Sequence, residues 1–99
     1  MRHTFEIRPA ADHEFDEASD WYNGEDPVVR DRFVVSVDNS ISAITLRPLE
    51  FPLVEGTKIR RAVVDGFPYS IFFILDGKHV VILSIFHDSR NPMIWRGRS

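Results

Sequence analysis

The residues best suited to chemistry lie in the second half of the chain, where His87 and Arg90 follow an apolar run and Arg60 and Arg61 precede another. Histidine changes its charge near neutral pH, so His87 could act as a general acid or base. Arg90 could hold a phosphate beside it, and Arg61 could stabilise a negatively charged transition state. These residue types fit the cleavage of RNA by attack of its own 2′-hydroxyl group, which needs a base, an acid and a cation.

Each of these residues also has a structural interpretation. A histidine at the end of a strand is more often a structural group than a catalyst. Arg60 and Arg61 lie on opposite faces of one strand, so either could pair with acidic residues while the other faces a partner. Trp21 and Trp95 are large apolar side chains and fit packing roles at least as well as binding roles. The residue types alone leave both interpretations open.

Length and composition predict one ordinary globular domain over residues 1–99, with 43% hydrophobic and 27% charged residues. No cysteine is present, which excludes disulfides and thiolate metal sites. His3, His13 and His79 do not have metal-ligand spacing, so we expect neither a metal nor a cofactor. We see no signal peptide and no membrane span, so we expect a cytoplasmic protein without a membrane partner.

The charge is distributed unevenly along the chain. Residues 1–57 hold 5 Lys or Arg against 12 Asp or Glu, a net of −7, whereas residues 58–99 hold 7 against 3, a net of +4. Such polarity indicates either two surfaces with different partners or simply acidic, solvated helix faces. The few basic residues that could cluster do not make a strong nucleic-acid footprint.

The elements that must position these residues are predicted best between Lys58 and His87. Three apolar runs are separated there by Asp65-Gly66 and Asp76-Gly77, and Asp-Gly between strands is a strong hairpin signal. We therefore predict a three-stranded antiparallel meander of strands 58–64, 69–75 and 80–86. The last two runs are apolar at almost every position, which predicts central strands covered on both faces.

The first half of the chain predicts a short strand followed by two amphipathic helices. The strand covers residues 2–8, and Pro9 starts the first helix, which we expect Asn23-Gly24 to stop. Pro27 starts the second helix, with Asp26 as its cap, and Pro48 ends it. Two such helices joined by about five residues make an antiparallel helical hairpin.

The predicted fold is therefore α+β, in the order β-α-α-β-β-β, with the helical hairpin packed on an antiparallel sheet. The N-terminal strand and the C-terminal meander together make up this sheet. Residues 48–57 form a connection. Pro92 can start a short C-terminal helical turn that lets Trp95 pack back on the body.

In this order, several segments resemble the RelE/ParE superfamily of bacterial toxins, and most closely its ParE-like, plasmid-stabilisation branch. The matching segments are EFDEASDWY, ITLRPLEFP, KIRRAVV, FPYSIFFIL and, most specifically, the ending VVILSIFHDSRNPMIW. The resemblance covers nearly the whole chain. It implies the same small sheet and helical hairpin, and a toxin of a type II toxin–antitoxin module that a cognate antitoxin neutralises.

The resemblance implies one of two targets. ParE-like members are associated with DNA gyrase, and RelE-like members cleave mRNA in the ribosome. Where family members often carry an arginine after the Pro-Tyr pair, this chain has Ser70, which cannot clamp a phosphate as a guanidinium does. No tyrosine follows Arg90. We therefore expect a non-enzymatic gyrase inhibitor that acts by protein binding, with a ribosome-dependent mRNA endoribonuclease as the alternative. A non-toxic relative that retains only antitoxin binding is the third possibility.

The resemblance and the residue types together predict two sets of contacts. For the target, and for catalysis if there is any, the candidates are Arg61, His87 and Arg90, joined by Trp95 as a binding residue. For the antitoxin, the candidates are Trp21, Tyr22 and Arg60. We expect an acidic, amphipathic antitoxin segment to bind by helix-in-groove contacts and by strand addition at a sheet edge, giving a hetero-oligomer.

Overall fold

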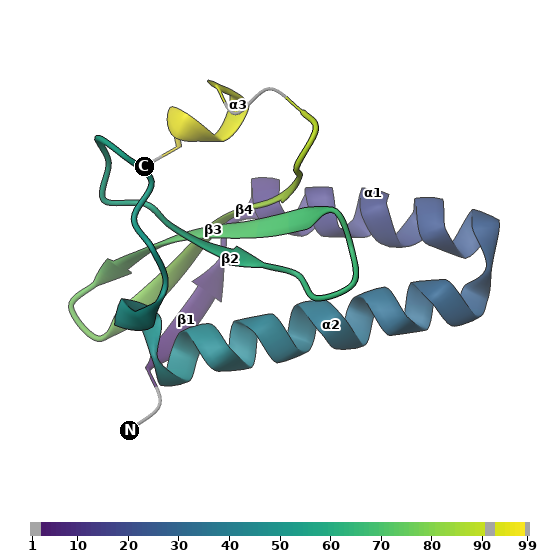
Figure 1. Ribbon diagram of the computed structural model, residues 1–99, viewed down its shortest axis with the longest axis horizontal. Helices are drawn as coiled ribbons and strands as arrows, with labels where there is room; N and C mark the ends of the chain where they lie inside the picture. The colour runs from purple at the N-terminus through teal and green to yellow at the C-terminus, as the bar shows by residue number, and fades with distance from the viewer. Residues whose placement is uncertain (1–2, 91–92, 99) are drawn as a thin grey trace.

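The computed structural model describes residues 3–90 and 93–98, and its elements follow the predicted order. Figure 1 shows a small sheet with two long helices on one side and a short helix on the other. The elements are β1 (Thr4–Ile7), α1 (Pro9–Glu25), α2 (Pro27–Leu46), a 3-10 turn η1 (Pro48–Glu50), β2 (Arg60–Val63), β3 (Tyr69–Asp76), β4 (His79–His87) and α3 (Met93–Arg96). The predicted α+β class is confirmed.

The helical hairpin is tighter than predicted, because a single residue, Asp26, separates the two helices. Its N–H donates to the Tyr22 carbonyl at 2.8 Å, and its carboxylate accepts from the Val28 N–H at 2.9 Å. Asp26 therefore ends α1 and caps α2 together. The prediction that Asn23-Gly24 stops α1 was wrong, as was the five-residue linker. The helix runs on to Glu25 and ends where the residue before a proline must become extended.

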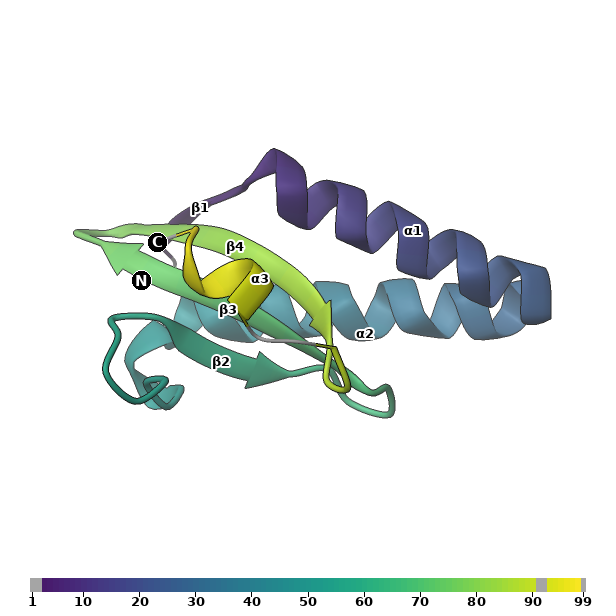
Figure 2. The ribbon, with the colours of Figure 1, turned by 90° about the horizontal axis from the view of Figure 1, so that it is seen from above.

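The sheet has the strand order β1-β4-β3-β2, so the two strongly apolar strands are central, as predicted (Figure 2). The β2–β3 and β3–β4 pairs are antiparallel, which confirms the meander. The N-terminal strand differs from the predicted antiparallel sheet, because β1 pairs in parallel with β4 and the sheet is mixed. Since the two antiparallel helices return the chain to the end where β1 began, β2 runs in the direction of β1. Two hairpin reversals later, β4 runs that way again.

The second hairpin confirms the Asp-Gly signal, with its turn shifted by one residue. Asp76 and His79 still pair across the strands, so the turn itself is Gly77-Lys78. Gly77 has φ +60°, which suits the first central position of a type II′ turn and costs a glycine little. The strands are therefore one residue longer at this end than the apolar runs alone indicate.

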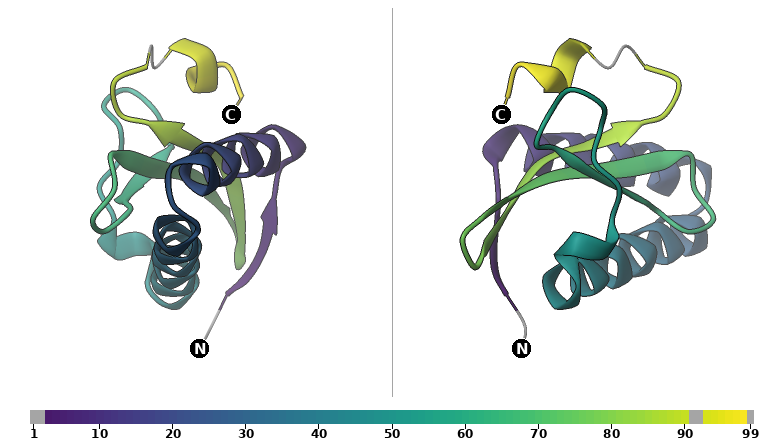
Figure 3. Two further views of the ribbon diagram at one scale, coloured as in Figure 1. Left: turned by 90° about the vertical axis from the view of Figure 1, so that its right-hand side faces the viewer. Right: turned by 60° about the vertical axis from the view of Figure 1, so that its left-hand side comes forward.

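Each face of the sheet has its own hydrophobic core, so the prediction of two covered faces is confirmed. On the helical side, Phe33 is fully buried among rings from α1 and β3. On the opposite side, α3 lies over the sheet (Figure 3), and Trp95 stacks on Phe72 with ring centroids 3.8 Å apart. Trp95 packs back on the body as expected. The predicted start of its helix at Pro92 lies outside the described residues.

The outer edge of β4 is closed by side chains rather than by a strand. β1 pairs only with residues 79–82 of β4, and beyond that point Glu14 of α1 accepts from the Ile85 N–H at 3.3 Å. Glu14 also accepts from Arg98 at 2.9 Å, and Arg98 donates to the Leu83 carbonyl at 3.3 Å. This Glu14–Arg98 pair thereby satisfies the backbone of an otherwise open edge and fastens the end of the chain to α1.

Candidate functional site

The structure places most of the predicted site residues on two surfaces. Arg61 lies on the face of the sheet that α3 covers. Arg90 lines a hollow of about 250 Å³ on this face together with Arg61 and Trp95. Arg90 also lines a groove beside α1, and that groove contains His87 and the two aromatic residues predicted for the antitoxin, Trp21 and Tyr22. A third surface, the groove between α2 and β2, contains none of the predicted residues.

On the face that α3 covers, Arg61 is tied into a three-residue network. Its Nε donates to the Ser70 hydroxyl at 2.9 Å, and its Nη2 lies 3.4 Å from the Asp88 carboxylate. Ser70 is fully buried and donates to the same carboxylate at 2.6 Å. Ser70, which stands where the resemblance led us to expect an arginine, thus joins an internal carboxylate to Arg61. The Asp88 carboxylate offsets the positive charge of Arg61 that would be needed to hold a phosphate.

His87 is held in one tautomer. The backbone N–H of Ser89 lies 3.1 Å from its Nδ1, and the Ser89 hydroxyl lies 2.8 Å from the same atom. A backbone N–H can only donate, so Nδ1 is an acceptor and the ring proton sits on Nε2. In this tautomer the imidazole offers Nε2–H as a donor, and the Nδ1 lone pair is engaged by Ser89.

His87 and Arg90 belong to a groove of about 490 Å³ between α1 and the ends of β3 and β4. We call this the aromatic groove and define it by Trp21, Tyr22, Tyr69, His87 and Arg90. Trp21 is 62% exposed, and its ring lies edge-on to the Tyr22 ring. The ring centroids of Tyr69 and His87 lie 5.1 Å apart. The groove therefore combines aromatic walls with several polar groups.

The tyrosine hydroxyls of the aromatic groove remain protonated at neutral pH. Burial raises the pKa of Tyr22. Burial also raises the pKa of Tyr69, with a further rise from Tyr22 and a smaller one from Glu17, while the Arg90 guanidinium lowers it. Both groups are therefore neutral hydroxyls rather than phenolates, and each can donate a hydrogen bond as well as accept one.

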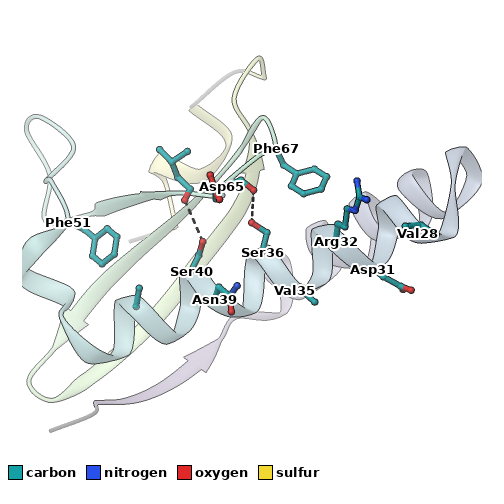
Figure 4. A pocket seen from close by; sticks show the side chains of 12 residues that line it. Val28, Asp31, Arg32, Val35, Ser36, Asn39, Ser40, Phe51, Asp65 and Phe67 are labelled. Atoms are coloured by element: carbon teal, nitrogen blue, oxygen red, sulfur yellow. Dashed lines mark hydrogen bonds between the residues drawn. The ribbon is translucent and has the colours of Figure 1, made fainter.

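The third surface is a groove of about 700 Å³ between α2 and β2, shown in Figure 4 and called here the α2 groove. Val28 and Val35 project from α2 beside it, 56% and 58% exposed, and Val63 of β2 is 61% exposed. Ser36 donates to the Asp65 carbonyl at 2.6 Å and so ties the helix to the strand side of the groove. An apolar surface of this kind on a small protein is typical of an interaction site.

Besides Arg61, two more predicted binding residues line neither the aromatic groove nor the α2 groove. Arg60 donates to the Phe51 carbonyl at 2.7 Å and so holds the connection that borders the α2 groove. Trp95 is only 3% exposed, so its ring is a packing residue and does not present a surface to a target. Within residues 3–90 and 93–98, no group of three metal-ligating side chains forms, and no helix is long and apolar enough to cross a membrane.

Sequence reasoning missed Tyr69 and the α2 groove. Tyr69 follows Pro68 in a segment singled out for its resemblance, but nothing in its spacing indicated that it would face α1. The α2 groove had a weak signal, because Val28 and Val35 are apolar residues off the buried stripe of α2. Isolated apolar residues are common on surfaces, so this signal becomes meaningful only once β2 is placed beside the helix.

A two-helix hairpin packed on a small sheet is the architecture that the resemblance to the RelE/ParE superfamily implied. The sequence profile of the ParE toxin of the type II toxin–antitoxin system parDE matches residues 5–92. The chain therefore belongs to the ParE toxin family.

Two solved structures share the fold. The chromosomal ParDE toxin–antitoxin system from P. aeruginosa superimposes with a TM-score of 0.77 at 18% identity, covering 87% of this chain and 96% of that chain. The toxin–antitoxin complex RelBE2 from Mycobacterium tuberculosis has a TM-score of 0.62 at 17% identity, with coverages of 88% and 99%. No curated protein sequence matches the chain.

Proposed function

We propose that this ParE-family toxin inhibits DNA gyrase in the cytoplasm by binding it, and that a cognate antitoxin neutralises it. One observation carries the choice of binding over cleavage: two of the three candidate catalytic groups are already engaged. Arg61 is bonded to Ser70 and Asp88, and the Nδ1 atom of His87 accepts from the Ser89 amide.

The engagement of His87 opposes both proton-transfer roles. As a base, the neutral ring would have to take a proton on Nδ1 and lose its bond to the Ser89 amide. As an acid, it would first need the doubly protonated form, in which the Nδ1–H would face that N–H donor at close range. Cleavage would therefore require a rearrangement of the segment after β4.

A ribosome-dependent endoribonuclease is the second candidate, and one observation favours it. Arg90 makes no ion pair with any residue that the structure describes, and it lines the same groove as His87. A free cation beside a histidine is the minimum for holding and cleaving a phosphodiester. A relative that binds an antitoxin without being toxic is the third candidate.

We expect DNA synthesis to fall before protein synthesis when the chain is induced without an antitoxin in a bacterial host. The measurement is pulse-labelling of both processes in the first minutes after induction, with an uninduced culture as the control. An early collapse of protein synthesis would replace the gyrase proposal with the endoribonuclease. If neither DNA synthesis nor protein synthesis changes, the third candidate, a relative that binds an antitoxin without being toxic, would replace both.

For the antitoxin, we propose that an amphipathic helix occupies the α2 groove. Both similar structures are described as toxin–antitoxin systems. An added strand at the neighbouring edge of β2 would need backbone groups that are already in use. The Arg61 N–H donates to the Pro52 carbonyl, and the Ser40 hydroxyl lies 3.5 Å from the Val63 carbonyl. A helix that buries apolar side chains against Val28 and Val35 fits this surface better than strand addition does.

Replacing Val35 by glutamine should weaken antitoxin binding about tenfold, which corresponds to the loss of about 1.4 kcal/mol of apolar burial. The matched control is Leu46→Gln, which removes a similarly exposed apolar residue of α2 outside the groove. Titration calorimetry with the antitoxin encoded beside the toxin gene would measure both affinities. Equal affinities for the two variants would move the antitoxin away from the α2 groove.

A further inference from the structure

The aromatic groove presents several hydrogen-bond donors that no described residue accepts from, beside two carboxylates that are already paired. The hydroxyls of Tyr22 and Tyr69 have no hydrogen-bond partner among the described residues, and the His87 ring offers only Nε2–H. The Arg90 guanidinium lies over the Phe86 ring at 5.2 Å, which orients it without neutralising it. A ligand that supplies oxygen acceptors would form hydrogen bonds with several of these donors at once.

The charges in the groove are arranged with opposite signs on its two sides. Glu17 lies on the α1 side and is paired with His13, while Arg90 lies on the sheet side. Glu14, the other carboxylate of the groove, is already paired with Arg98. An acidic group would therefore be attracted to the Arg90 end and repelled from the Glu17 end.

The nearby edge of β4 cannot receive an additional strand without disrupting existing contacts. Glu14 and Arg98 already occupy the Ile85 N–H and the Leu83 carbonyl. A partner must therefore bind this groove through side chains that enter it. The exposed Trp21 ring provides the apolar contact at its rim, and tryptophan and arginine are the residue types that dominate binding energy at interfaces.

We infer that the aromatic groove is the surface that binds the target protein. The bound part is a segment of the target that carries an acidic side chain next to an apolar one. The acidic group lies against Arg90 and the tyrosine hydroxyls, and the apolar side chain lies against Trp21. This inference rests on the proposed function, because it assumes that the toxin acts by binding a protein. It also moves Trp21 and Tyr22 from the antitoxin to the target.

The test compares two variants in the inhibition of DNA supercoiling by purified gyrase. Trp21→Ala and Arg90→Gln should each weaken inhibition by at least tenfold while leaving antitoxin affinity within twofold of the unmodified toxin. Both side chains are exposed, so we expect circular dichroism and thermal unfolding to show intact folds. Arg47→Gln, a change of the same type at an exposed position at the end of α2, is the control and should inhibit normally.

The outcomes separate the inference from the proposed function. If the unmodified toxin does not inhibit gyrase, the proposed function fails and the groove loses its assigned partner. If it does inhibit, and the two variants inhibit equally well, the groove is not the target surface. If Trp21→Ala instead weakens antitoxin binding, the original assignment of Trp21 to the antitoxin stands and the inference is wrong.

A third variant tests the acidic character of the partner. Arg90→Lys keeps the positive charge and loses the planar fork, so it should inhibit gyrase more strongly than Arg90→Gln and less strongly than the unmodified toxin. If Arg90→Lys is no better than Arg90→Gln, the charge of Arg90 does not contribute to recognition. That result would overturn the acidic segment as the partner.

Discussion

Replacing Phe33 by alanine is expected to lower the free energy of unfolding by about 3–5 kcal/mol, the usual cost of removing a fully buried phenyl ring. Phe33 is 0% exposed, and its ring contacts Phe15 and Tyr22 of α1 and Phe67 and Tyr69 on the other side. It therefore joins the helical hairpin to the sheet. Domains of this size have only about 5–15 kcal/mol of stability, so the variant should be close to unfolding.

Urea denaturation followed by circular dichroism would measure this loss. The control is Val35→Ala on the same helix, where the side chain is 58% exposed and the change should stay within about 0.5 kcal/mol. A loss below about 1 kcal/mol for Phe33→Ala would mean that the aromatic cluster is not packed as described. Because Tyr22 and Tyr69 belong to this cluster, the same variant should also disturb the aromatic groove.

Glu14→Ala is expected to destabilise the fold by about 3–5 kcal/mol, because it removes one partner of a largely buried ion pair. The Glu14 and Arg98 side chains are 11% and 24% exposed, and the carboxylate accepts from Ser84 and the Ile85 amide as well. The variant leaves a guanidinium, a hydroxyl and a backbone N–H without that acceptor. The loss should exceed that of the double variant Glu14→Ala/Arg98→Ala, which leaves no unpaired charge.

The unfolding free energies can be measured by the same denaturation, and hydrogen exchange of the Ile85 amide gives a local readout. Asp16→Ala on the exposed face of α1 is the control and should change stability by less than about 0.5 kcal/mol. If Glu14→Ala costs no more than this control, the edge of β4 does not depend on the Glu14–Arg98 pair. Faster exchange at Ile85 with an unchanged global stability would restrict the role of the pair to that edge.

Most of the secondary structure could be predicted because its causes are local. Pro9 and Pro27 start helices, apolar runs form central strands, and Asp76-Gly77 marks a hairpin, each through the conformational limits of a few neighbouring residues. The errors came where two local signals competed. Gly24 would suit a helix end, but Asp26 and Pro27 make a better one, so α1 continued past Gly24.

The candidate site was predicted less well, because its residues are distant in the sequence. Arg61 and His87 were expected to share one target surface, but the side chain of Arg61 lies on the α3 side of the sheet while His87 lies beside α1. The role of Ser70 as a bridge between Arg61 and Asp88 required the β2–β3 register and the turn after β4. Neither follows from residue types.

The sequence by itself determined the order of the elements, the central position of β3 and β4, and membership in a toxin superfamily, because periodicity, turn residues and motif order are readable along one chain. Only the tertiary structure decided the parallel direction of β1, the pairing of Glu14 with Arg98 and the tautomer of His87. The first two depend on groups that approach one another across long separations in sequence, and the third depends on the conformation of the turn that brings Ser89 back onto His87. That choice is made by the packing of the whole molecule, to which each local pattern contributes only a part.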